Sequence, residues 1–263
     1  MDLGIAGRVA LVGASANGLG LATAERFAME GCSVAICDLN AAALEVAKAR
    51  VATAATGGQV QVWQVDLRDP TSIEKLVSGV ADELGPVDIL VTNSGGPPPG
   101  SFEDSSDEKW QLSFELTFLS AVRLIREVLP GMKERNWGRI VNFTSRTLRE
   151  PIPNLMLSNA TRLAVAGMAK TLAAEVAAHG ITVNNLGPGP TSTDRAIELA
   201  AARAAKKGIT VEEELKVTES RIPRGRMAKP EEQAAVAVFL ASELAGHITG
   251  AGLIVDGGES GSL

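Results

Sequence analysis

The segment Arg8-Val9-Ala10-Leu11-Val12-Gly13-Ala14-Ser15-Ala16-Asn17-Gly18-Leu19-Gly20 contains the strongest indication of how this chain folds. Its apolar first part predicts a buried strand, and the pattern from Leu19 to Glu30 predicts a helix. Glycines between a strand and a helix let the backbone turn sharply, and free N–H groups at the helix N-terminus can face a phosphate. The segment therefore predicts a phosphate-binding turn, although close packing of the helix on the sheet would also require small residues.

Short apolar runs alternate with longer helical patterns along the whole chain, as expected for successive βαβ units and a parallel sheet. The predicted strands are Arg8 to Val12, Ser33 to Cys37, Val60 to Val65, Val87 to Val91, Arg139 to Phe143, Ile181 to Leu186 and Gly252 to Val255. The predicted helices are Leu19 to Glu30, Ala41 to Ala55, Ile73 to Leu84, Trp110 to Arg135 and Asn159 to His179. This order predicts an α/β fold.

The length of the chain suits one domain. Its 263 residues, 45% of them apolar, can bury a sizeable core. No repeat, low-complexity tract or linker divides the sequence, so we expect residues 1–263 to form a single domain. The one long irregular stretch, residues 187–230, carries a polar helical pattern, and loops of this length are usually functional. We expect this stretch to form a lid over a substrate site.

Composition narrows the classes of partner. The formal net charge is −6 and the basic residues are scattered, which argues against nucleic acid or an anionic membrane as partner. No apolar run reaches the roughly 20 residues of a membrane span, and the first eight residues do not resemble a signal peptide. Cys32 and Cys37 lack neighbours that would complete a metal site, so we expect reduced core thiols and no metal. These features predict a cytoplasmic protein with a small-molecule substrate.

Asp38 closes the second predicted strand, 20 residues after Gly18. A carboxylate at this place can accept hydrogen bonds from a ribose 2′-hydroxyl and repel a 2′-phosphate. This position favours NAD over NADP as the cofactor. An alternative remains open, because Asp38 could instead be an ordinary N-cap of the helix that starts near Ala41.

Five motifs in register make the chain similar to the short-chain dehydrogenase/reductase family. They are Gly18-Leu19-Gly20, Asp66-Leu67, Asn93-Ser94-Gly95, Pro188-Gly189 with Thr193, and Asp256-Gly257-Gly258. The stretches Leu129-Pro130, residues 180–184 and residues 223–230 look most like the β-ketoacyl carrier-protein reductase branch. The resemblance covers nearly the whole chain. It implies a Rossmann-type doubly wound domain with a seven-stranded parallel sheet flanked by helices, and a homo-oligomer, tetramer or dimer, built on Trp110 to Arg135 and Asn159 to His179.

The resemblance also implies which residues bind the nicotinamide dinucleotide. Residues 18–20 would approach the pyrophosphate, 66–67 the adenine, 93–95 the adenosine side, and 188–193 the nicotinamide amide. The full predicted set is Gly13, Ser15, Asn17, Gly18, Leu19, Gly20, Asp38, Asp66, Leu67, Asn93, Ser94, Gly95, Pro188, Gly189 and Thr193. Ala14 stands where the family has a glycine. An alanine at a turn that needs a positive φ costs stability, whereas Ala14 fits this turn if its φ stays negative.

The catalytic positions differ from the family pattern. The chain contains no tyrosine, whereas the family uses a Tyr as proton donor, a Lys four residues later, a Ser and an upstream Asn. By resemblance, Ser145 matches the Ser, Ser158 stands in place of the Tyr, Arg162 in place of the Lys, and Thr117 in place of the Asn. A serine hydroxyl is a far weaker acid than a phenol, and an arginine does not relay protons. Losing a matched general acid costs about 10²–10⁴ in rate, which would leave a slow reductase.

Three charged residues follow Ser145 in a loop expected beside the pocket. Arg146 and Arg149 could clamp an anionic substrate, or they could be solvated loop charges. Glu150 is a candidate substitute acid or base. We expect His179 and His247 to lie near helix ends, away from the site.

We expect an NAD(H)-linked oxidoreductase, similar to 3-oxoacyl reductases, that acts on a small carbonyl or alcohol compound. Two other readings stay open. One is a non-redox enzyme on the same fold, as in haloalcohol dehalogenases, which resemble this family and have an Arg in place of the Lys. Those enzymes keep the Tyr and lack the dinucleotide site, whereas this chain keeps its Gly-rich turn. The other is a catalytically degenerate dinucleotide-binding or assembly protein.

Overall fold

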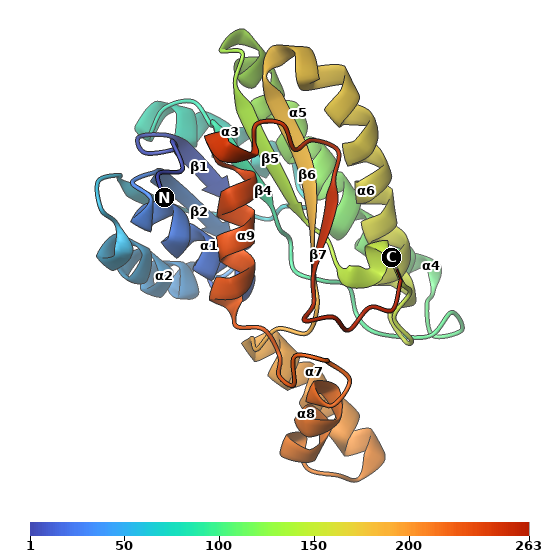
Figure 1. Cartoon of the computed structure of the whole chain (residues 1–263). Helices are drawn as coiled ribbons and strands as arrows, with labels where there is room; N and C mark the ends of the chain where they lie inside the picture. The colour runs from blue at the N-terminus through green and yellow to red at the C-terminus, as the bar shows by residue number, and fades with distance from the viewer. Residues whose placement is uncertain (263) are drawn as a thin grey trace.

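The computed structural model describes residues 1–262, and its strands form one parallel sheet in the order β3-β2-β1-β4-β5-β6-β7. The strands are β1 (Val9–Val12), β2 (Ser33–Asp38), β3 (Val60–Gln64), β4 (Ile89–Thr92), β5 (Gly138–Phe143), β6 (Ile181–Pro188) and β7 (Gly252–Val255). From β1 the chain runs outward to β3, then crosses back to β4 and runs outward to β7 (Figure 1). This doubly wound order confirms the predicted Rossmann-type fold.

Helices cover both faces of the sheet (Figure 1). On one face, α1 (Gly18–Met29), α2 (Ala41–Ala54) and α9 (Pro230–Leu240) pack against the strands. On the other face lie α3 (Pro70–Glu83), α5 (Ser120–Glu134) and α6 (Met156–Val176). Because both faces are covered, the strand interiors are buried on both sides, as expected for a parallel sheet.

Strand β1 shows how the two halves of the core are divided. Ala10 and Val12 pack into the cluster beneath α1, α2 and α9, whereas Val9 and Leu11 pack into the cluster beneath α3, α5 and α6. Successive side chains of a strand point to opposite faces, so one apolar run supplies both clusters. Phe27 of α1 is fully buried in the first cluster.

The predicted helix Trp110 to Arg135 is not one continuous α-helix. It consists of α4 (Asp107–Ser113), a π-helical segment η1 (Phe114–Leu119) and α5. A π-helical turn holds an extra residue, which a 3.6-residue apolar pattern does not reveal, and such turns often occur at functional sites. Thr117 lies within η1.

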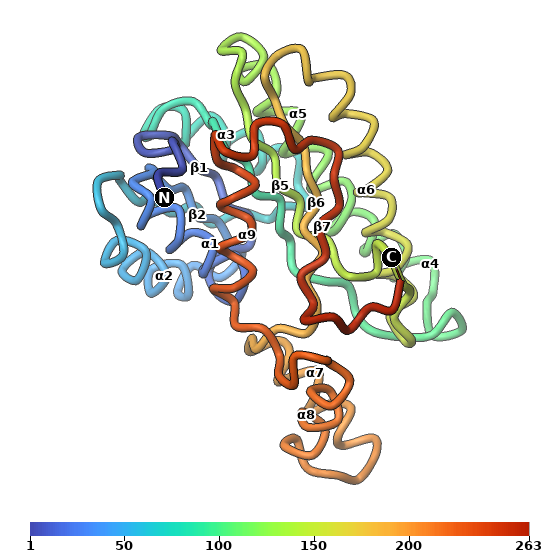
Figure 2. Tube along the Cα trace, in the orientation of Figure 1, coloured from blue at the N-terminus to red at the C-terminus, as the bar shows by residue number. Residues whose placement is uncertain are grey.

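The stretch predicted to be irregular, residues 187–230, contains two helices. Strand β6 runs on to Pro188, and α7 (Asp194–Lys207) and α8 (Val211–Glu219) follow. In Figure 2 the trace leaves β6, passes through α7 and α8 and returns to α9. A backbone bridge between Thr191 and Ala228 closes the base of this excursion. Buried Glu214 of α8 bonds Arg203 and Lys207 of α7 at 2.8 and 2.6 Å, which fixes the two helices to each other.

Both cysteines are free and buried. Burial raises the pKa of each thiol to about 12, so both stay neutral and poorly nucleophilic near neutral pH. Among residues 1–262, no set of three or more Cys, His, Asp or Glu side chains is arranged to hold a metal ion. None of the helices in that range has the length and apolarity that crossing a membrane requires.

We expect the substitution Phe27→Ala to lower the free energy of unfolding by about 3–5 kcal/mol, because it leaves a cavity between α1 and the sheet. Met29 lies on the same helix but is 50% exposed, so Met29→Ala should change the free energy of unfolding by no more than about 0.5 kcal/mol. Urea unfolding followed by circular dichroism measures both. Equal losses in the two variants would contradict this packing.

Candidate active site

The loops that follow the strands meet at one edge of the sheet. The N–H of Gly13 donates to Val91 O at 3.0 Å, which joins the turn after β1 to the end of β4. The N–H of Thr144 donates to Leu186 O at 2.8 Å, which joins the end of β5 to β6. This edge is where doubly wound folds bind their ligands, at the carboxyl ends of the strands on either side of the switch in strand order.

The Gly-rich turn fits the phosphate-binding role expected of it. Gly18 has a positive φ of 55°, and a Cβ on Gly20 would lie 2.4 Å from the carbonyl oxygen of Ala14. The first-turn N–H groups of α1 have no intrahelical acceptors, and the exposed side chain of the N-cap, Asn17, does not bond to them. Glycine thus permits close packing at this turn, and the helix N-terminus keeps open donors with a positive dipole end.

Of the two conformations considered for Ala14, the structure shows the one that costs an alanine stability. Its φ is +43°, in the left-handed region that favours glycine. Its carbonyl oxygen accepts a hydrogen bond from Asn93 Nδ2 at 3.1 Å, which ties the turn to the loop after β4. Packing on both sides therefore imposes a conformation that an alanine adopts only at a cost in stability.

Asp38 and Ser15 connect the Gly-rich turn to β2. The buried hydroxyl of Ser15 donates to Val12 O at 2.7 Å and accepts from the N–H of Cys37 at 3.0 Å. Its side chain is thus engaged inside the protein rather than at the open edge. The half-buried carboxylate of Asp38 accepts from the N–H of Ala16 at 3.3 Å.

The alternative reading of Asp38 as the N-cap of the next helix is wrong. The cap of α2 is Asn40, whose side chain accepts from the N–H of Ala43 at 3.1 Å. Asp38 therefore lies beside the Gly-rich turn and does not cap α2.

The predicted adenine-side residues are only partly open. The Asp66 carboxylate is paired with the Arg68 guanidinium, with N–O distances of 2.7 to 3.2 Å, and this pairing lowers the pKa of Asp66. Leu67 is buried in the core, whereas Ser94 is half-buried. Next to Asp66 an open surface hollow of about 480 Å³ lies between the start of α3 and the helices α4 and α5.

The loop after β6 lies against the Gly-rich turn. The Thr193 methyl carbon is 3.5 Å from the position that a Cβ on Gly18 would occupy, so the two segments are in contact distance. The Thr193 hydroxyl caps α7 by accepting from the N–H of Ala196 at 3.2 Å. Pro188 ends β6 and Gly189 follows it, and both are half-buried. Segments 175 residues apart in the chain thus lie against each other.

Ser158 and Arg162 lie one turn apart on α6 and are bonded to each other. Arg162 Nε donates to Ser158 Oγ at 3.1 Å, and its Nη1 donates to the carbonyl oxygens of Phe143 and Thr144 at 3.0 and 2.7 Å. Its Nη2 donates to Gly95 O at 3.0 Å. Burial, and then the nearby charge of Arg195, lower the pKa of Arg162 to about 10, so the guanidinium remains charged at neutral pH.

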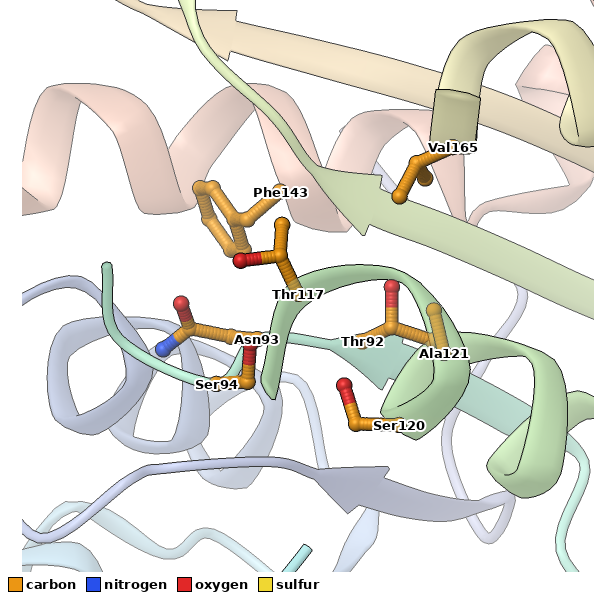
Figure 3. Close-up of a pocket in the computed structure, with 8 residues that line it drawn as sticks. All are labelled: Thr92, Asn93, Ser94, Thr117, Ser120, Ala121, Phe143 and Val165. Atoms are coloured by element: carbon orange, nitrogen blue, oxygen red, sulfur yellow. The ribbon is translucent and has the colours of Figure 1, made fainter. Parts of the chain in front are cut away.

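Ser145 and Thr117 occupy neighbouring elements. Ser145 caps the short helix η2 (Arg146–Leu148) by accepting from the N–H of Thr147 at 3.2 Å. Thr117 is buried, and its Oγ1 has no hydrogen-bond partner among residues 1–262. It lines a cavity of about 10 Å³, the size of one water molecule, between Phe143 and the end of β4 (Figure 3).

The charged loop residues do not form the predicted clamp. Arg146 is paired with Glu259 at 3.0 Å, and both side chains are largely buried. Arg149 is exposed, and Glu150 Oε2 accepts from the N–H of Gly261 at 3.1 Å, so Glu150 tethers the C-terminal segment. His179 ends the short helix η3 (Ala177–His179) after α6.

The sequence analysis missed Arg195. This residue lies in the first turn of α7, and its Nη2 donates to Gly96 O at 2.8 Å and Pro97 O at 3.3 Å. Nothing in the local sequence marks it, because the contact joins residues about 100 positions apart. The only feature of the sequence that could have indicated Arg195 is its charge near the start of the predicted lid.

Comparisons with known proteins agree with this architecture. A family model described as enoyl-(acyl carrier protein) reductase matches residues 13–260. A D-β-hydroxybutyrate dehydrogenase of Cupriavidus necator is 33% identical over 253 residues, 96% of this chain and 97% of that protein. L-Sorbose reductase from Gluconobacter frateurii, solved with NADPH and L-sorbose, has a TM-score of 0.95 at 35% identity, with 100% of both chains covered. A variant of actinorhodin polyketide ketoreductase, solved with NADPH, has a TM-score of 0.91 at 32% identity, with 97% of both chains covered.

The matches extend over nearly all of the chain, and the solved structures share its fold. This chain belongs to the short-chain dehydrogenase/reductase family of oxidoreductases.

We expect Ala14→Gly to raise the free energy of unfolding by about 1 kcal/mol, because glycine removes the left-handed strain at φ +43°. Ala16 is the matched control, since it is buried without a positive φ, and Ala16→Gly should lower the same quantity by at least about 0.5 kcal/mol. Urea unfolding measures both. Destabilisation in both variants would show that the Ala14 backbone is not strained.

Proposed function

We propose that this chain is an NAD(H)-linked oxidoreductase that acts on a small carbonyl or alcohol substrate. The observation that carries the proposal is the open N-terminus of α1 beside Gly18, with the Asp38 carboxylate bonded to the same turn. The chemistry that a bound nicotinamide dinucleotide supplies is hydride transfer. Relatives named D-β-hydroxybutyrate dehydrogenase and acetoacetyl-CoA reductase favour a 3-oxo or 3-hydroxy compound as the substrate class.

The Asp38 carboxylate beside the Gly-rich turn favours NAD over NADP. The Asp38 carboxylate lies where it can accept hydrogen bonds from ribose hydroxyls, and its negative charge would repel a 2′-phosphate. Three of the similar structures were solved with NADPH and a fourth protein is named an NADPH-dependent reductase, so these names do not support the preference for NAD. The preference rests on Asp38 alone.

At the reacting centre, Ser158 would act as a hydrogen-bond donor to the substrate oxygen. Its Oγ accepts from Arg162 Nε, and no hydrogen bond between described residues uses its own proton. Ser145 would be a second donor, because its Oγ accepts from the N–H of Thr147 and no hydrogen bond between described residues uses its proton. Two hydroxyl donors aimed at a carbonyl oxygen would stabilise the negative charge that develops there.

Arg162 would hold this centre positive rather than move a proton. Its guanidinium is held by three backbone carbonyl oxygens and stays charged at neutral pH. A nearby cation favours the oxyanion and polarises the Ser158 hydroxyl. Serine is nevertheless a poor acid, so we infer an atypical site in which the final proton comes from water, and Thr117 with its small cavity is the candidate position for such a water.

The proposal also covers the domain organisation, the lid and the assembly of the protein. We infer that residues 1–263 act as one catalytic domain, with residues 187–230 as the substrate lid, since Thr193 and Arg195 at the start of α7 contact the Gly-rich turn and the loop after β4. Figure 1 shows α7 and α8 projecting from the body of the molecule. A homo-oligomer, tetramer or dimer, and a cytoplasmic location belong to the same proposal.

The non-redox alternative is weaker because the Gly-rich turn keeps its open helix N-terminus. A protein without catalysis on this fold is the second candidate, since neither Ser158 nor Arg162 is a matched general acid. A measurement of cofactor binding distinguishes the non-redox enzyme from the oxidoreductase. A measurement of turnover distinguishes the protein without catalysis from the oxidoreductase.

We expect calorimetric titration to give tighter binding of NADH than of NADPH. Asp38→Asn removes the charge but keeps an acceptor for the N–H of Ala16, so it should shift the NADPH/NADH affinity ratio about tenfold or more toward NADPH. Asp82→Asn, at an exposed position on α3, is the control and should leave the ratio unchanged. An unaltered ratio in Asp38→Asn would refute the NAD preference, and binding of neither nucleotide would refute the oxidoreductase proposal.

We expect Ser158→Ala and Ser145→Ala each to lower kcat/KM by about 10²-fold or more, because each removes a donor to the developing oxyanion. The assay is oxidation of NADH or NADPH with acetoacetyl-CoA and L-sorbose, the compounds named for relatives. Thr171→Ala removes an exposed hydroxyl from α6 and should leave the rate unchanged. Wild-type rates in both serine variants would place the reacting centre elsewhere.

A further inference from the structure

Two guanidinium groups approach the same point of the loop after β4. Arg162 of α6 and Arg195 of α7 place their Nη2 atoms 3.6 and 3.3 Å from the position that a Cβ on Gly96 would occupy. Arg162 Nη2 donates to Gly95 O, and Arg195 Nη2 donates to Gly96 O. The two side chains come from separate elements and converge beside Gly96.

Among residues 1–262, neither arginine has an acidic partner. None of the ion pairs between residues 1–262 includes Arg162 or Arg195. All protein acceptors of Arg195 are backbone carbonyl oxygens, and it donates to them from Nη2 only. Its Nε and Nη1 donors therefore remain for a ligand. By contrast, Arg146 in the nearby loop is neutralised by Glu259.

The pair carries uncompensated positive charge in a partly buried place. Arg162 is half-buried, and after burial itself the charge of Arg195 is the next cause that lowers its pKa. Two like charges at short range repel, and the repulsion is stronger away from bulk water. An anion between the two groups would offset both the repulsion and the burial of Arg162. Guanidinium groups bind carboxylates and phosphates through paired N–H donors.

The pair lies between the reacting centre and the loop after β4, whose Gly95 was predicted to line the adenosine side. Arg162 Nε bonds Ser158 Oγ, so the charge lies next to the proposed donor to the substrate oxygen. Arg195 belongs to α7, the first helix of the proposed lid. An oxyanion held here would lie between the lid and the reacting centre.

We propose that Arg162 and Arg195 form an oxyanion site that binds the carboxylate or phosphate of the substrate, so the enzyme acts on anionic carbonyl or alcohol compounds. The assignment to the substrate rests on the proposed function. The anion site itself rests on the arginine geometry and can be tested without turnover. The shared chemistry is an oxyanion, and its other possible source is the phosphate of a dinucleotide.

The test is thermal unfolding of the full chain in sodium phosphate or sodium acetate, against sodium chloride at equal ionic strength. We expect the oxyanions to raise the Tm of the wild type by about 2–4 °C more than that of Arg195→Gln. Arg195 is exposed, so the Arg195→Gln variant should fold. Arg195→Lys should keep part of the rise in Tm, because lysine retains the positive charge but lacks the paired N–H donors of the guanidinium. Lys75→Gln, which removes an exposed cation on α3, should behave as the wild type.

The source of the anion is read from the same measurement with saturating NADH or NADPH. If the Arg195-dependent shift persists, the oxyanion site is separate from the dinucleotide and belongs to the substrate. If a bound dinucleotide abolishes it, the site serves cofactor phosphate and the substrate assignment is overturned. An equal oxyanion effect in the wild type and Arg195→Gln would overturn the site altogether. Failure of both nucleotides to bind would refute the proposed function while the arginine comparison still tests the site.

Discussion

Burial of a parallel sheet on both faces is the constraint on which the rest of this structure depends. Helices cover each face, so the strand interiors hold apolar side chains, and polar chemistry is displaced to the strand ends. The carboxyl ends of all seven strands lie at one edge because the strands are parallel. The turns after β1, β4, β5 and β6 therefore meet there. Backbone bonds such as Gly13 N–H to Val91 O hold these turns in register with the sheet.

Contacts between turns at this edge of the sheet explain the strained conformation of Ala14. Its carbonyl oxygen is held by Asn93 and is packed against Gly20, so the backbone has little freedom to relax. Ala14 therefore adopts a positive φ although it has a Cβ methyl group. Strain of this kind persists only where surrounding contacts impose it. The turn is thus shaped by its neighbours in space rather than by the preference of its own residue.

Arg162 links the candidate catalytic centre to an unusual distribution of charge. A lysine at this place would present a compact charge, whereas the guanidinium reaches Ser158, the end of β5 and the loop after β4 at once. It therefore organises the backbone around the centre as well as contributing charge. With Arg195 it forms a pair of cations that no carboxylate of residues 1–262 neutralises, a local positive charge that the overall charge of −6 does not suggest.

The sequence by itself determined the seven strands, the crossover helices between them and the position of the Gly-rich turn, because apolar periodicity and glycine spacing are local consequences of packing and backbone geometry. The doubly wound order of the sheet was implied by the family resemblance, and α7, α8 and α9 were not predicted as separate helices. Tertiary structure alone decided the π-helical turn around Thr117, the positive φ of Ala14, the neutralisation of Arg146 by Glu259 and the approach of Arg195 to Arg162. Each of these depends on residues far apart in the chain or on a single extra residue in a helix, and neither leaves a periodic signal. The predicted roles of the site residues stay predictions, since a role depends on the ligand as well as on the fold.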